Sequence, residues 1–181
     1  DGLRSSAMPI DCGNSATTMR LLVGLLAATG LPAILDGSDG LRRRPMTRIV
    51  EPLWEMGVPI RARGEGGTAP LDIAPRILDQ PLRALDYHSP VASAQVKSCL
   101  LLAGLAAETP LTIQEPAPSR DHTERMLAGM GVNIERTENG DGSVEVTLRP
   151  GDGDSLTPLH LTVPGDLSSA AFLIVAALTT P

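Results

Sequence analysis

Aromatic side chains are scarce in this sequence, which holds one tryptophan, one tyrosine and one phenylalanine in 181 residues. Proteins that bind single-stranded nucleic acid commonly stack its bases on aromatic rings, so this scarcity argues against such a role. The formal net charge of -6 at pH 7 also opposes a general affinity for nucleic acid or anionic membranes. We therefore expect neither as a partner, although a local cluster of basic residues can still hold a small anion.

Cysteine is scarce too, because only Cys12 and Cys99 are present. Two cysteines are too few for a disulfide framework and lack the spacing of metal ligands, so we expect them to serve in packing. The three histidines are scattered, each without a second ligand nearby. Walker loops, dinucleotide-binding glycine fingerprints and nucleophile elbows are also absent from the sequence. We predict a cytoplasmic protein that uses no metal ion and no cofactor.

The sequence has no long apolar run, and its first residues do not show the basic-then-apolar pattern of a targeting leader. The longest apolar run, around residues 100–107, is far shorter than the ~20 residues that a membrane-spanning helix needs. Hydrophobic residues make up 42% of the chain, enough for a buried core of leucine, valine, isoleucine and alanine. The chain begins at Asp1 rather than at a methionine, and we expect it to be a segment of a longer protein.

The clearest positive feature is an internal repeat. We predict a helix from Ser15 to about residue 28 in the first copy, and a helix from Ser93 to about residue 107 in the second. A second helix follows in each copy and ends in nearly the same letters, WEMGVPI at 54–60 and AGMGVNI at 128–134. The glycine of each of these motifs is expected to end the helix.

Strands complete each copy of the repeat. We predict them at residues 32–35, 58–63 and 71–74 in the first copy, and at residues 111–114, 132–136 and 143–148 in the second. With a further strand before its first helix, each copy has the order strand, helix, strand, helix, strand, strand, a βαβαββ unit, which indicates an α+β fold. A third copy begins near the end of the chain, at LHLTVPGDLSSAAFLIVAAL.

Small polar residues run directly into an apolar helical pattern at matching positions of the three copies, namely at 15–16, 93–94 and 168–170. Serine caps the first turn, the alanines leave the free backbone N–H groups approachable, and the helix dipole favours negative charge there. Ordinary capping explains any one junction alone. Three junctions at matching positions favour anion binding.

Arginines stand before the second helix of both copies. The first copy has RRRPM at 42–46, and the second has Ser119 and Arg120 at nearly the equivalent place. An arginine there can grip a phosphate or carboxylate with two parallel hydrogen bonds. Arg44, next to the proline, is favoured as a ligand, whereas the other two arginines of that run fit solvated charges equally well. Lys97 fits a helix-surface lysine as well as a ligand.

Five motifs occur together and in order: GNSATTMRLLVGLLA, RRRPMTRIVEPLWEMGV, VASAQVKSCLLLAGL, SRDHTERML and VPGDLSSAAFLIVAAL. They resemble the 5-enolpyruvylshikimate-3-phosphate synthase family over essentially all 181 residues. The resemblance implies the enolpyruvyl transferase fold, an inverse α/β barrel of repeated βαβαββ units with helix N-termini facing the substrate cleft. Residues 1–162 would supply two of the three units of one domain, and residues 163–181 the hinge crossing and the first helix of a second domain.

The resemblance also implies a reaction, in which the enolpyruvyl group of phosphoenolpyruvate moves to the 5-hydroxyl of shikimate-3-phosphate and phosphate is released. This step belongs to the shikimate pathway of aromatic amino acid biosynthesis. By motif, Ala16 and Arg44 would contact phosphoenolpyruvate. The residues implied at shikimate-3-phosphate are Ser93, Ala94, Gln95, Ser119 and Arg120, and Gln95 would reach both substrates.

No catalytic residue is assigned, because the acid and base residues of the family have no counterpart in this sequence. Asp166 is open between a direct role and a helix cap. We expect the chain to need the remainder of its parent to complete the site, and to be inactive alone. Two alternatives stay open: a UDP-N-acetylglucosamine enolpyruvyl transferase, which shares the fold and one substrate, and a non-catalytic binding or assembly module.

Position 16 departs from the commoner family motif, which has glycine there. The added methyl of Ala16 would project into the space that glyphosate, a longer analogue of phosphoenolpyruvate, must fill. Overpacking of this kind typically costs about 1 to 3 kcal/mol. The resemblance therefore implies reduced sensitivity to glyphosate.

Overall fold

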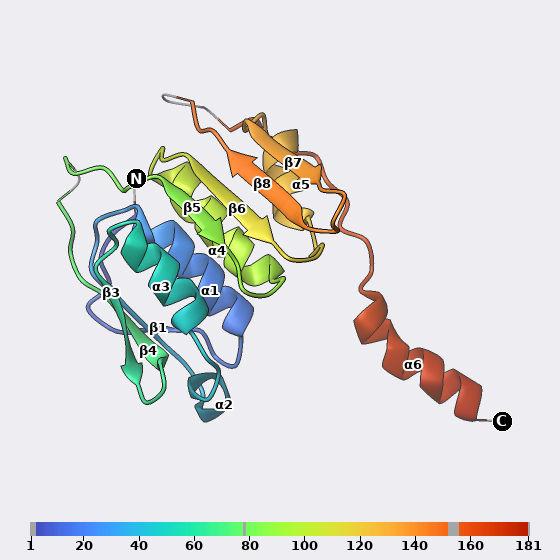
Figure 1. Cartoon of the computed structure of the whole chain (residues 1–181). Coiled ribbons are helices and arrows are strands. Elements are labelled where there is room, and N and C mark those ends of the chain that lie inside the picture. Colours follow the sequence, from blue (N-terminus) through green and yellow to red (C-terminus); the bar gives the residue numbers. More distant parts are fainter. Residues whose placement is uncertain (1–2, 78, 152–155, 181) are drawn as a thin grey trace.

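The computed structural model describes residues 3–77, 79–151 and 156–180. The first repeat contains β1 (Ile10–Asp11), α1 (Ala16–Ala27), β2 (Ala33–Asp36), α2 (Asp39–Arg42), α3 (Thr47–Glu55), β3 (Ile60–Gly64) and β4 (Thr68–Ile73). The second repeat contains β5 (Leu85–His88), α4 (Ala94–Ala106), β6 (Leu111–Glu115), α5 (His122–Gly129), β7 (Ile134–Glu138) and β8 (Val144–Leu148). Helix α6 (Leu167–Thr179) follows them (Figure 1).

The two repeats form two four-stranded sheets with the same order, β1-β2-β4-β3 and β5-β6-β8-β7. In each sheet the first two strands pair in parallel and the other neighbours pair antiparallel. This shared topology confirms the predicted pair of βαβαββ units. The short helix α2, capped by the Ser38 side chain, is the one addition that the sequence pattern did not predict within the first unit.

The helix ends follow the predicted local signals. The Ser15 hydroxyl accepts a hydrogen bond from the Thr18 amide at 3.1 Å and so caps α1. Ser93 caps α4 in the same way. Gly57 and Gly131 follow α3 and α5 with φ values of +97° and +91°, a backbone conformation that side-chain-bearing residues rarely adopt. These glycines therefore end the helices, as their motifs predict.

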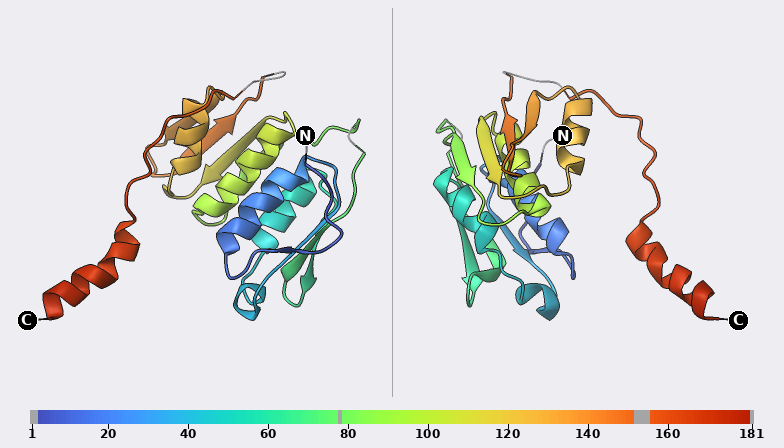
Figure 2. Two further views of the ribbon diagram at one scale, coloured as in Figure 1. Left: turned by 180° about the vertical axis from the view of Figure 1, so that it is seen from behind. Right: turned by 45° about the vertical axis from the view of Figure 1, so that its right-hand side comes forward.

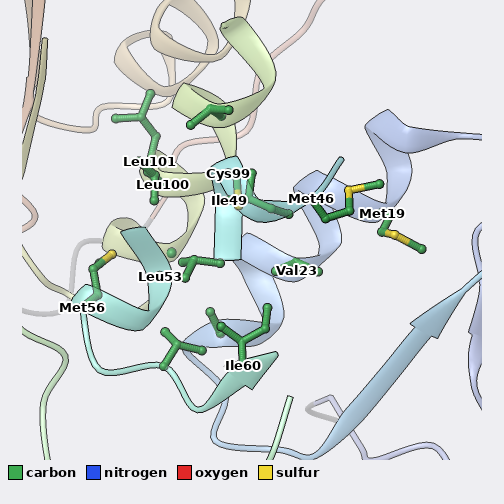
Figure 3. Close-up of a cluster of buried hydrophobic side chains, with 14 of the residues drawn as sticks. Met19, Val23, Met46, Ile49, Leu53, Met56, Ile60, Cys99, Leu100 and Leu101 are labelled. Atoms are coloured by element: carbon green, nitrogen blue, oxygen red, sulfur yellow. The ribbon is translucent and has the colours of Figure 1, made fainter. Parts of the chain in front are cut away.

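Helices α1, α3 and α4 pack together and share one hydrophobic core across the two units (Figure 3). Helices α1 and α4 approach so closely that a methyl added at Gly24 would lie 2.2 Å from the carbonyl oxygen of Cys99. Both cysteines are free and buried, and burial raises the pKa of the Cys99 thiol to about 12. The packing role predicted for the cysteines is confirmed.

Helix α6 projects away from the two units in every view (Figures 1 and 2). It has no buried residue, and its large apolar side chains are exposed, among them Phe172 at 82% and Leu178 at 80%. None of the helices in the described ranges is long and apolar enough to cross a membrane.

Candidate anion-binding site

Helices α1 and α4 lie side by side with their N-termini at the same end, and hydrogen bonds join those ends. The Gln95 side-chain amide donates to the Thr17 hydroxyl at 2.7 Å. The amide oxygen of Gln95 accepts a hydrogen bond from Arg20, one turn further along α1. Arg20 also donates to the carbonyl oxygen of Pro45 at 2.9 Å, which ties the RRRPM loop to the two helices. Residues that are far apart in the sequence thus meet around Arg20.

Positive charge is concentrated beside these helix ends. Burial lowers the pKa of the Arg20 guanidinium, and the neighbouring charges of Arg44 and Arg48 lower it further. In the part of the chain that the structure describes, none of these three arginines forms an ion pair with a carboxylate. Uncompensated arginines beside two helix N-termini can hold a small anion with several negative charges.

Arg42 differs from Arg44 although only one residue separates them. Its guanidinium grips the Asp36 carboxylate through two hydrogen bonds of 2.8 and 2.5 Å. This contact holds the pKa of Asp36 below its usual range and raises that of Arg42. Arg42 is therefore engaged within the first unit, whereas the Arg44 side chain is exposed and unpaired within the described ranges.

The start of α4 is connected to the loop before α5 by a buried carboxylate. Glu115, at the end of β6, accepts a hydrogen bond from the Ser93 backbone amide at 2.7 Å. Its other oxygen accepts one from the Ser119 hydroxyl at 2.8 Å. The same oxygen lies 2.8 Å from the Lys97 ammonium. The structure thereby brings Ser93 and Ser119 to one place, as the motifs imply.

Lys97 is not a surface lysine, so the first of the two interpretations that the sequence left open is wrong. Its side chain is 1% exposed and lies between Glu115 and Glu124, two buried carboxylates. The Lys97 ammonium is 2.7 Å from a Glu124 oxygen, although neither oxygen of Glu124 accepts a hydrogen bond with suitable geometry within the described ranges. The ammonium also donates to the Ser119 hydroxyl at 2.8 Å.

The remaining implied site residues differ in how accessible they are. Ala94 and Gln95 are partly buried in the first turn of α4, and Arg120 is exposed next to Ser119. Ala16, in contrast, is 2% exposed and belongs to the hydrophobic core. Contact between Ala16 and a ligand would require the atoms that cover it to move.

The third polar-to-apolar junction does not join the other two. Asp166 caps α6 by accepting hydrogen bonds from the backbone amides of Ser168 and Ser169 at 2.9 and 3.2 Å. Asp166 thus takes the helix-cap role, one of the two that the sequence left open. Because α6 projects from the body of the molecule, its N-terminus lies apart from those of α1 and α4 (Figure 2).

Sequence reasoning missed Arg20, Glu115 and Glu124. Strand alternation could have located Glu115, because it continues the inward-facing series that begins with Leu111 and Ile113. Nothing local indicates Arg20, whose hydrogen-bond partners lie on another helix and in a distant loop.

Comparisons with known proteins show the family of this chain. The sequence profile of the family described as EPSP synthase (3-phosphoshikimate 1-carboxyvinyltransferase) matches residues 2–181. The 3-phosphoshikimate 1-carboxyvinyltransferase of Wolinella succinogenes is 49% identical over 180 residues, which cover 99% of this chain and 39% of the relative. That of Synechococcus sp. strain RCC307 is 50% identical over 182 residues, covering 100% of this chain and 40% of the relative.

A solved structure of EPSP synthase from Acinetobacter baumannii matches with a TM-score of 0.80 and 43% sequence identity. The match covers 97% of this chain and 37% of that structure. The chain thus spans about 40% of the length of the curated relatives that it matches. From the profile match and these identities, the chain belongs to the EPSP synthase (3-phosphoshikimate 1-carboxyvinyltransferase) family.

Proposed function

We propose that this chain forms the phosphoenolpyruvate- and shikimate-3-phosphate-binding part of a cytoplasmic 3-phosphoshikimate 1-carboxyvinyltransferase. The observation that carries the proposal is the contact of Gln95 with Thr17 and Arg20, which joins two helix N-termini beside the unpaired Arg44. Both proposed substrates are small anions, and such a place suits them.

Phosphoenolpyruvate is proposed to bind at the α1 end. Arg44 would take its charged groups, and Ala16 would lie in the turn beneath it. Shikimate-3-phosphate would bind at the α4 end, between Ser93, Ala94 and Gln95 on one side and the loop of Ser119 and Arg120 on the other. Gln95 would reach both substrates, because its amide lies between the two helix starts.

In this scheme the chain contributes position and charge to the reaction. Holding two reactants in a productive geometry converts a bimolecular step into an effectively unimolecular one. Fixed arginines and helix N-termini stabilise negative charge that develops on the tetrahedral intermediate. Proton transfer is assigned to residues of the parent protein beyond these 181.

The proposal extends to domain organisation. Residues 1–162 would form two of the three βαβαββ units of one domain, and residues 163–181 would cross the hinge and start a second domain. The exposed apolar side chains of α6 support this division, because such a helix needs a partner surface.

A full-length chimera tests the function. In it, these 181 residues replace the matching segment of the Wolinella succinogenes relative. We expect the chimera to release phosphate from phosphoenolpyruvate when shikimate-3-phosphate is the acceptor, and not when UDP-N-acetylglucosamine is. The reverse preference would identify the other enolpyruvyl transferase, and no activity with either acceptor would favour a binding module.

A further inference from the structure

A cluster of three charged side chains is buried beside the proposed site. Lys97 of α4, Glu115 of β6 and Glu124 of α5 are each no more than 4% exposed. Taking charges out of water is costly, and well-packed apolar residues of similar volume often stabilise a protein as well as a buried ion cluster does. Stability alone therefore does not account for these residues.

The first repeat shows that the βαβαββ unit does not require the cluster. Its α1, β2 and α3 have the same places in the topology as α4, β6 and α5, yet they carry no charge at the matching positions. Lys97 aligns with Met19 from the helix starts, Glu115 with Gly37 from the register of the parallel strand pairs, and Glu124 with Val50 from the helix-ending glycines.

The hydrogen bonds of the cluster lead to the proposed shikimate-3-phosphate residues. One Glu115 oxygen accepts a hydrogen bond from the Ser93 backbone amide at 2.7 Å, and the other accepts one from the Ser119 hydroxyl at 2.8 Å. A single carboxylate thus connects both segments that would surround that substrate. Glu124 pairs with Lys97 but, among the described residues, accepts no hydrogen bond from either segment.

Lys97 cannot itself bind the substrate in this arrangement. Its ammonium has three donor hydrogens and is surrounded by oxygens of Glu115, Ser119 and Glu124 at 2.7 to 2.8 Å. With 1% of its surface exposed, it has no open side. Its charge acts on Glu115, which it keeps in place.

We propose that Glu115, held by Lys97, is a positioning residue for the shikimate-3-phosphate half of the site. It fixes the Ser93 backbone and the Ser119 hydroxyl relative to each other before the substrate arrives. This inference rests on the proposed function, and it assigns Glu115 and Lys97 no contact with the substrate.

Two matched substitutions in the full-length chimera test the inference. Glu115→Gln leaves one acceptor oxygen where the carboxylate has two, so either Ser93 or the pair of Lys97 and Ser119 loses its acceptor. We expect the KM for shikimate-3-phosphate to rise about tenfold or more, with the KM for phosphoenolpyruvate within about twofold of the parent value. Glu124→Gln is the control, because it also removes a buried partner of Lys97; both KM values should stay within about twofold.

An uncharged variant separates positioning from folding. The triple variant Lys97→Met, Glu115→Leu, Glu124→Leu removes the three charges of the cluster and keeps the side-chain volumes similar. We expect its thermal midpoint to equal or exceed that of the unsubstituted chimera. The KM for shikimate-3-phosphate should still rise about tenfold or more, because Ser93 and Ser119 have lost their common partner.

The possible results are distinguishable. Equal effects of Glu115→Gln and Glu124→Gln, an unchanged shikimate-3-phosphate KM in the uncharged variant, or its failure to fold would each overturn the positioning role. Absence of turnover in the unsubstituted chimera would instead overturn the proposed function, and this inference with it.

Discussion

Neighbouring residues of the same type have different tasks in this chain. Arg42 is committed to Asp36 through two hydrogen bonds, whereas Arg44 is without a carboxylate partner in the described ranges. Arg20 is held by Gln95 and by the Pro45 carbonyl. Within the described ranges, Arg44, like Arg48, therefore retains donors that a ligand could use.

Substitution of Arg44 tests this division of roles. In the full-length chimera we expect Arg44→Ala to raise the KM for phosphoenolpyruvate by about tenfold or more, because a charge-assisted contact is lost. The control is Arg42→Ala, which breaks the contact with Asp36 but should leave this KM within about twofold. Steady-state kinetics with saturating shikimate-3-phosphate measures both. A parent-like KM in Arg44→Ala would contradict the assignment.

Ala16 gives a prediction on inhibition. We expect Ala16→Gly to make the chimera more sensitive to glyphosate, by at most one to two decades, the range that about 1 to 3 kcal/mol of overpacking implies. Because Ala16 is buried, removal of its methyl group would create space beneath the first turn of α1 rather than on the protein surface. Inhibition constants at matched phosphoenolpyruvate saturation measure the effect, and equal constants would show that the methyl is not the discriminator.

At the scale of elements, the site depends on how closely α1 and α4 pack. Gly24 permits that distance, since any side chain there would meet the backbone of Cys99. The Gln95 contacts with Thr17 and Arg20 form only if the two helix starts stay together. Packing in the middle of the helices therefore controls geometry at their ends.

We expect Gly24→Ala to lower the thermal midpoint of the chimera and to raise the KM for both substrates. The added methyl would lie 2.2 Å from the Cys99 oxygen, so the helices must separate, at a cost of about 1 to 3 kcal/mol or more. Gly140→Ala is a matched control, because a methyl there meets nothing within 4 Å. Equal midpoints for the two variants would refute the close-packing argument.

The sequence predicted the elements well because their signals are local. Ser15 and Ser93 start helices, and Gly57 and Gly131 end them, through interactions within one or two turns. The role of Lys97, in contrast, could not be predicted from local sequence signals. It lies on a helix that is apolar on several sides, and its hydrogen-bond and ion-pair partners come from β6, the following loop and α5.

At the scale of the whole molecule, the described structure combines a well-packed body with an unpartnered helix. The body shares one core between two units, while α6 exposes Leu167, Phe172, Leu173 and Leu178. Helices with such apolar surface are normally covered in folded proteins. This contrast agrees with the proposal that residues 163–181 start a second domain.

The last prediction concerns the 181-residue chain by itself. We expect it to release no phosphate from phosphoenolpyruvate and shikimate-3-phosphate, because it spans about 40% of the length of its relatives and the proposed function assigns proton transfer to the remainder of the parent. Glu115 and Glu124, two carboxylates beside the proposed site, are buried and engaged with Lys97, so they cannot supply the missing acid or base. Phosphate release is measured beside the full-length chimera at equal concentration, after circular dichroism has established that the chain is folded. Turnover by the folded chain above a protein-free blank would contradict this prediction and would place a proton-transfer group within these residues.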